Sequence, residues 1–186
     1  MAEVFGDLLR IGAVQYGQFE IRGKMGIFAP LSINLRLVPS YTVVMAALAA
    51  EIAPLVKVAG TTHLLTMPAV TPLGVLASQL AERMLVYPLD GKIEGAYDFN
   101  EPTVLLTDVL TDGAAELAMI KEARREGLDV EALVAVIDFG KPITGLTIAR
   151  RAWMGIEDVL TASQSAGKLT ATMRAMVDRW LAQENQ

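Results

Sequence analysis

The chain has 186 residues, of which 53% are hydrophobic and 20% charged, and its net charge is −5. This apolar fraction excludes a disordered chain and is large enough to build the core of one domain. The lack of cysteine excludes disulfides and thiolate metal sites and fits a cytoplasmic protein, and the acidic balance leaves no basic stripe for nucleic acid.

Hydrophobic periodicity and turn residues divide the first part of the chain into predicted elements. Residues 3–16 predict an amphipathic helix, and residues 18–37, rich in aromatic and β-branched side chains, predict a hairpin. The apolar run at 41–56 predicts a buried helix, because it is shorter than the roughly 20 residues that cross a bilayer. After it we expect a strand at 57–67, a helix at 71–82, a short strand at 83–89 and a loop at 91–102.

The second part of the chain alternates continuous apolar runs with helical patterns. Strands are predicted at 103–109 and 131–139, and helices at 113–127, 143–153 and 169–183. Short apolar strands that alternate with helices predict a single α/β domain, whose parallel sheet is covered on both faces. Ligands of such folds bind beyond the carboxyl ends of the strands. The segments at these ends are 67–71, 87–90, 108–113 and 138–141.

Several common sites lack their residues. No G-x-G-x-x-G and no G-x-x-x-x-G-K-[ST] occurs, so dinucleotide and Walker-type sites are not predicted. His63 is the only histidine, and it lies inside a predicted apolar strand. We therefore expect a core histidine there, and no zinc site.

The stretch TVLLTDVLTDGAA (103–115) resembles the ribose-phosphate loop of type I phosphoribosyltransferases. Four other segments are similar, in the same order, to parts of the orotate phosphoribosyltransferase branch: GIFAPLSINLR (26–36), PLGVLASQLAERMLVY (72–87), KIEG (92–95) and GLDVEALVAVIDF (127–139). Together they cover about the whole chain. The resemblance implies a central, mostly parallel sheet flanked by helices, with a small N-terminal hood over roughly residues 1–40. It also implies a homodimer in pyrimidine metabolism that binds phosphoribosyl diphosphate or a nucleoside monophosphate.

The resemblance also implies roles for particular residues. Asp108 corresponds to the second ribose-binding acid, and Thr107 takes the place of the first. Lys92 corresponds to a catalytic lysine of a mobile loop, and Mg²⁺ would enter with the bound diphosphate. The family's phosphate loop wraps a 5′-phosphate with backbone N–H groups at a helix N-terminus. Its counterparts here are Thr111, Asp112, Gly113, Ala114 and Ala115.

Asp112 is an unusual residue for a phosphate loop, because a carboxylate within about 5 Å of a phosphate is repelled by roughly 1 to 3 kcal/mol. Two arrangements follow. Asp112 turns away and caps the next helix, which leaves the N–H groups of Gly113, Ala114 and Ala115 open to an anion. Alternatively, the carboxylate accepts those N–H bonds itself and fills the phosphate's place.

Other positions depart from the orotate pattern. Pro88 and Leu89 stand where the family has paired loop cations. Phe139 replaces the arginine that reads the orotate carboxylate, and a phenyl ring makes no such bidentate bond. Lys141 could supply a charge there, and either Arg22 or Lys24 could supply one near the base. Orotate is therefore disfavoured as a substrate. The alternatives are a non-catalytic nucleotide-sensing or regulatory protein on the same fold, and a doubly wound domain of unrelated function.

Overall fold

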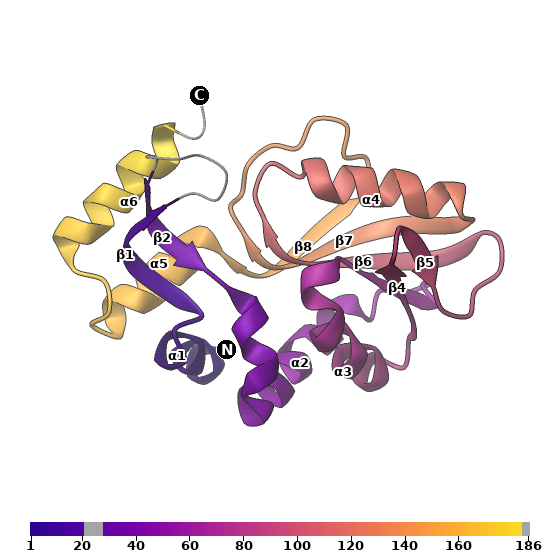
Figure 1. Cartoon of the computed structure of the whole chain (residues 1–186), viewed down its shortest axis with the longest axis horizontal. Helices are drawn as coiled ribbons and strands as arrows, with labels where there is room; N and C mark the ends of the chain where they lie inside the picture. Colours follow the sequence, from indigo (N-terminus) through magenta and orange to yellow (C-terminus); the bar gives the residue numbers. More distant parts are fainter. Residues whose placement is uncertain (21–27, 184–186) are drawn as a thin grey trace.

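A computed structural model describes residues 1–20 and 28–183. Arg22 and Lys24 lie outside the described residues. The elements, labelled in Figure 1, are α1 (Ala2–Arg10), β1 (Val14–Glu20), β2 (Phe28–Ile33), the 3₁₀ turn η1 (Leu35–Ser40), α2 (Thr42–Val56), β3 (His63–Thr66), η2 (Pro68–Val70), α3 (Thr71–Ala81), β4 (Met84–Leu89), β5 (Lys92–Glu94), β6 (Glu101–Leu110), α4 (Ala114–Arg125), β7 (Leu128–Asp138), β8 (Ala149–Gly155), α5 (Ile156–Ser165) and α6 (Ala171–Gln183).

The central sheet has six strands in the order β5-β4-β3-β6-β7-β8. Strands β4, β3, β6, β7 and β8 are parallel, and β5 pairs antiparallel with β4 at the edge. Helix α4 covers one face of the sheet, and α2 and α3 cover the other (Figure 1). The α/β class is therefore confirmed, and so is the parallel pairing predicted for the strands around 57–67, 103–109 and 131–139.

Alternate residues of the central strands enter two different cores. In β6, Leu106 faces the core shared with α2 and α3, whereas Leu105 faces the core under α4. Leu133 and Val134 of β7 divide in the same way, and all four side chains are fully buried. Both faces of these strands need apolar residues, which explains the continuous apolar runs in the sequence.

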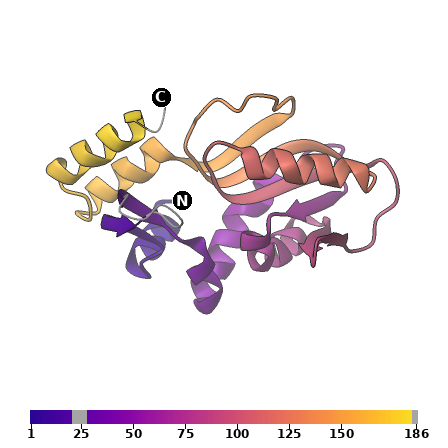
Figure 2. The same ribbon diagram turned by 45° about the horizontal axis from the view of Figure 1, so that its top comes forward.

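The hood combines the two ends of the chain. Strands β1 and β2 form a separate antiparallel pair, and they lie with α1, α5 and α6 beside the central sheet (Figures 1 and 2). The hydroxyl of Tyr16 on β1 donates to Ser163 Oγ on α5 at 2.7 Å. Burial raises the pKa of the Tyr16 phenol, so this donor stays protonated well above neutral pH. The two C-terminal helices thus complete a hood that the resemblance placed in the first 40 residues.

The helix predicted over residues 3–16 ends earlier than expected. Helix α1 stops at Arg10, and Gly12 has a left-handed φ of 75°. The N–H of Ala13 bonds to Leu8 O at 2.9 Å, and that of Gly12 to Leu9 O at 3.2 Å. This pattern is a Schellman motif, in which glycine terminates the helix. Residues 14–16 instead begin strand β1.

The prediction of an unstructured loop over 91–102 was also wrong. Residues Lys92–Glu94 form strand β5, which pairs with β4. Asp90 and Gly91 connect the two strands with φ values of 49° and 79°. Two successive positive φ values are typical of the Asp-Gly type I′ turn of tight hairpins.

The local pattern of residues 143–153 predicts a helix, but no helix occupies them. The segment includes the first part of strand β8, which pairs parallel with β7 at the sheet edge, and the unpredicted helix α5 follows. This strand depends on its partner, because pairing with β7 overrides a local pattern that favours a helix. The strand expected over 57–67 is shorter, at His63–Thr66.

His63 is a core residue, as predicted. Its ring is fully buried, with Nδ1 2.8 Å from Thr62 Oγ1 and Nε2 3.1 Å from Ala96 O. In the described part of the chain, no helix has the length and apolar character needed to cross a membrane.

Candidate functional site

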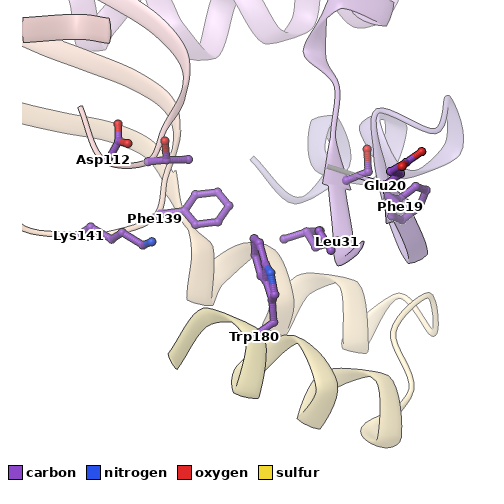
Figure 3. A pocket seen from close by; sticks show the side chains of 10 residues that line it. Phe19, Glu20, Leu31, Asp112, Phe139, Lys141 and Trp180 are labelled. Carbon is purple, nitrogen blue, oxygen red and sulfur yellow. The ribbon is translucent and has the colours of Figure 1, made fainter. Parts of the chain in front are cut away.

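A cavity of about 350 Å³ lies between the hood and the carboxyl ends of the central strands. Figure 3 shows side chains from three directions around it: the hairpin, helix α6, and the loops after β6 and β7. Its lining residues are Phe19, Glu20, Ala29, Leu31, Ser32, Thr111, Asp112, Phe139, Lys141 and Trp180. Two of the four predicted strand-end segments, 108–113 and 138–141, thus contribute to it.

The loop after β6 leads directly into helix α4. The N–H of Ala114 donates to Asp112 Oδ1 at 3.0 Å, so the carboxylate of Asp112 already occupies one of the three N–H groups of this loop. Within the described residues, the N–H groups of Gly113 and Ala115 have no hydrogen-bond acceptor. Two donors therefore remain open at this helix N-terminus, where the helix dipole favours an anion.

Gly113 is held in a conformation that few other residues adopt. Its φ is +74°, and a Cβ built on it would lie 2.6 Å from Ile143 Cδ1 and 2.7 Å from Ile143 Cγ2. Ile143 belongs to the loop after β7, so its side chain closes over the backbone of the first loop. This packing fixes the backbone of the loop whose residues Thr111 and Asp112 line the cavity.

The two residues expected at the ribose differ in their surroundings. Asp108 is partly exposed near the end of β6, and its carboxylate has no hydrogen bond or ion pair with any described residue. Thr107 is fully buried, and its hydroxyl donates to Glu116 Oε1 of α4 at 2.7 Å. Neither residue lines the cavity, and the Thr107 hydroxyl instead fixes the start of α4 against the sheet.

The loop after β7 is fixed by Arg150 of β8. The Arg150 guanidinium forms a bidentate ion pair with the Asp138 carboxylate, with Nε 2.5 Å from Oδ2 and Nη2 on Oδ1. Its Nη1 donates to Lys141 O at 2.7 Å, and the N–H of Gly140 donates to Asp138 Oδ1 at 2.7 Å. These bonds fix the backbone of residues 138–141. The side chains of Phe139 and Lys141, which belong to this loop, line the cavity.

The remaining predicted site residues lie elsewhere. Lys92 is exposed at the start of β5, directly after the Asp90-Gly91 turn, and it does not line the cavity. Ala114 and Ala115 are exposed in the first turn of α4. Among the described side chains, no group of three or more histidines or acids could hold a metal ion.

Sequence reasoning missed three residues that shape the site. Trp180 reaches the cavity from α6, Ile143 packs on Gly113, and Arg150 binds Asp138. Trp180 carried a weak signal, since it is a large aromatic residue within the helix predicted over 169–183. Ile143 and Arg150 carried none, because both act through contacts between different loops and strands.

No family model matches the sequence. Three solved structures have similar folds. The Leishmania donovani UMP synthase has a TM-score of 0.86 at 23% identity, over 98% of this chain and 42% of that one. The Francisella tularensis orotate phosphoribosyltransferase has a TM-score of 0.75 at 19% identity, over 98% of this chain and 96% of that one. The Mycobacterium tuberculosis orotate phosphoribosyltransferase, solved with 5-phospho-α-D-ribosyl 1-diphosphate, has a TM-score of 0.69 at 15% identity, over 85% of this chain and 97% of that one.

These similarities define the fold of the chain as that of the type I phosphoribosyltransferases. Within this fold, the chain is similar to solved orotate phosphoribosyltransferases, with the mostly parallel sheet flanked by helices that the sequence resemblance implied. The chain spans less than half of the UMP synthase chain that it matches.

Proposed function

We propose that the chain binds a phosphoribosyl compound, either phosphoribosyl diphosphate or a nucleoside monophosphate, with its 5′-phosphate at the loop of residues 111–115. The observation that carries this proposal is the pair of N–H groups on Gly113 and Ala115 that have no acceptor among the described residues. They lie at the start of α4 and follow directly on Thr111 and Asp112, which line the cavity. Backbone donors at a helix N-terminus are suited to a phosphate. The carboxylate of Asp108, which has no partner among the described residues, would then hold the ribose hydroxyls.

Glycosyl transfer is the chemistry that the resemblance favours. The base nitrogen would form a bond to the anomeric carbon while diphosphate leaves, so the site has to exclude water and hold both groups in place. Mg²⁺ would enter on the diphosphate oxygens, as the resemblance implies. Lys92 would approach the diphosphate from the β4–β5 hairpin.

A second candidate is a non-catalytic protein that senses a nucleotide. The specific observation in its favour is the tight Asp90-Gly91 turn, which stands where the resemblance implies a long mobile loop. For either candidate we propose pyrimidine metabolism as the setting and the cytoplasm as the location, in keeping with the cysteine-free composition. Nucleic acid and membranes are not proposed as partners.

Asp112 provides the test of the phosphate site. Replacing it with threonine or asparagine should raise the affinity for ribose 5-phosphate about tenfold, because about 1.4 kcal/mol of repulsion is relieved. The amide oxygen of the asparagine variant would still accept the Ala114 N–H, so that variant separates charge from hydrogen bonding. Asp129→Asn is the matched control, since Asp129 is exposed at the opposite end of β7. Calorimetric titration measures each affinity.

Two results would count against this site. An unchanged affinity in both Asp112 variants would show that the carboxylate neither fills the loop nor repels what binds there. A failure of every variant to bind ribose 5-phosphate would overturn the proposed function itself.

Orotate should be a poor substrate. Phe139 stands where an arginine would hold the orotate carboxylate, and Pro88 and Leu89 replace paired cations. Loss of one preorganised group of this kind costs about 10²–10³ in rate. We therefore expect orotate turnover at least a hundredfold below the roughly 10 per second of an ordinary enzyme. The decrease in orotate absorbance measures it, and turnover at the ordinary rate would contradict the assignment of Phe139.

We also propose a two-fold homodimer formed through the hairpin side of the molecule. Phe28 on β2 and Met176 on α6 are each 45% exposed and line a groove of about 680 Å³ between these elements. Light scattering at micromolar concentration should give twice the 20.0 kDa mass of one chain. Phe28→Asp should shift this mass to the monomer, whereas Val43→Asp on α2 should not. A monomeric unaltered chain would refute the dimer.

A further inference from the structure

Aromatic side chains form the apolar part of the cavity. Phe139 extends from the loop after β7, Trp180 from α6, and Phe19 from β1. Figure 3 shows the Phe139 and Trp180 rings converging beside the buried side chain of Leu31. Flat aromatic surfaces of this kind stack on planar heterocycles, and the stacking does not require a charge on the ring.

The polar part of the cavity contains both charges and neutral hydroxyls. Asp112 and Lys141 come from the strand-end loops and Glu20 from β1, and Thr111 and Ser32 add hydroxyl groups. No arginine is among the described residues that line the cavity, so the bidentate partner that a ring carboxylate prefers is absent from them. Asp112 and Glu20 would repel a ring carboxylate, and Lys141 offers it a point charge in place of a bidentate fork.

Arg150 fixes the position of Phe139 through bonds to the residues on both sides of it in the chain. Arg150 binds the residue before it, Asp138, and the carbonyl of Lys141 two residues after it. A phenyl ring held in this way presents a stable apolar face at the position where the loop meets the cavity. Preorganised apolar surface reduces the entropic cost of binding a rigid ring.

We propose that this cavity selects an uncharged planar nitrogen heterocycle, stacked on Phe139 and Trp180, over a heterocycle with a ring carboxylate. The proposal rests on the proposed function, because the ring would be attached to the phosphoribosyl group held at the loop of residues 111–115. The ring's hydrogen-bond donors and acceptors would meet Asp112, Lys141 and the neighbouring hydroxyls.

Uridine 5′-monophosphate and orotidine 5′-monophosphate form a matched pair for the test, since they differ by one ring carboxylate. The uridine compound should bind at least tenfold more tightly and should quench the fluorescence of Trp180. Phe139→Leu and Trp180→Leu should each weaken it several-fold while leaving ribose 5-phosphate affinity unchanged. Phe139→Arg should reduce or reverse the preference between the two nucleotides. Phe99→Leu, at an exposed aromatic residue outside the cavity, is the control.

Ribose 5-phosphate has no base, so its binding distinguishes a failure of the inference about the ring from a failure of the proposed function. If it binds and orotidine 5′-monophosphate binds as tightly as the uridine compound or more tightly, the inference about the ring is overturned and the proposed function stands. If ribose 5-phosphate itself does not bind, the proposed function fails and the inference fails with it. Circular dichroism of each variant shows that the fold is retained.

Discussion

Replacing Gly113 with alanine should lower the free energy of unfolding by about 2–5 kcal/mol. A left-handed backbone costs a residue with a Cβ about 1–2 kcal/mol, and overpacking costs about 1–3 kcal/mol more. The overpacking arises because the new Cβ would lie 2.6 to 2.9 Å from three carbons of Ile143. Urea denaturation monitored by circular dichroism measures the loss. The same variant should bind ribose 5-phosphate more weakly, since the open N–H groups lie on this backbone.

The Ile143→Ala substitution separates the cost of backbone strain at position 113 from the cost of overpacking against Ile143. In the double variant the new Cβ at position 113 has room, so the cost of the Gly113 substitution should fall to that of the backbone strain alone. A coupling energy of about 1–3 kcal/mol between the two sites is expected for residues in direct contact. Additive effects would show that Ile143 does not restrain the loop, and the account of Gly113 would then be wrong.

Removing the guanidinium at position 150 should have the second large effect. Arg150→Met leaves the Asp138 carboxylate, whose side chain is 12% exposed, with the Gly140 N–H as its remaining described partner. Breaking a buried pair costs about 3–5 kcal/mol. The Arg150 side chain is itself 22% exposed and partly screened, so we expect a loss of about 2–3 kcal/mol. Thermal and urea unfolding measure it.

The neighbouring arginine is a matched control for this change. Arg151→Met removes the same charge from the same strand at an exposed position, and should change stability by less than about 0.5 kcal/mol. The double variant Asp138→Asn with Arg150→Met should recover part of the loss, because no unpaired charge then remains buried. An Arg150→Met protein as stable as the Arg151→Met protein would show that the clamp on the loop of residues 138–141 contributes nothing.

The parts of this fold that were predictable are those with a local cause. Apolar runs at 103–109 and 131–139 require cover on both faces, so they indicated a parallel sheet before any pairing was known. The loop after β6 was recognisable from its glycine and small residues between a strand and a helix. Gly12 and Asp90-Gly91 were local signals that the predictions missed, since the first ends α1 and the second forms the turn of the β4–β5 hairpin.

The parts that were not predictable depend on distant segments. Residues 149–155 form a strand because β7 offers an edge for pairing, and nothing in their own pattern requires it. The Arg150–Asp138 ion pair joins two neighbouring strands. Trp180 and Phe139 line the same cavity only because α6 folds back onto the hairpin. Asp112 shows the same limit at atomic scale, since its carboxylate accepts the Ala114 N–H but not those of Gly113 and Ala115, which is neither of the two arrangements that the sequence left open.

The central claim is that the loop of residues 111–115 holds a 5′-phosphate. A crystal structure of the chain soaked with ribose 5-phosphate tests it most directly. We expect phosphate oxygens at hydrogen-bond distance, about 2.7–3.2 Å, from the backbone nitrogens of Gly113 and Ala115. We also expect the ribose hydroxyls on Asp108. A phosphate bound away from this loop, or a loop with no phosphate at saturating ligand, would show that the loop is not a phosphate site.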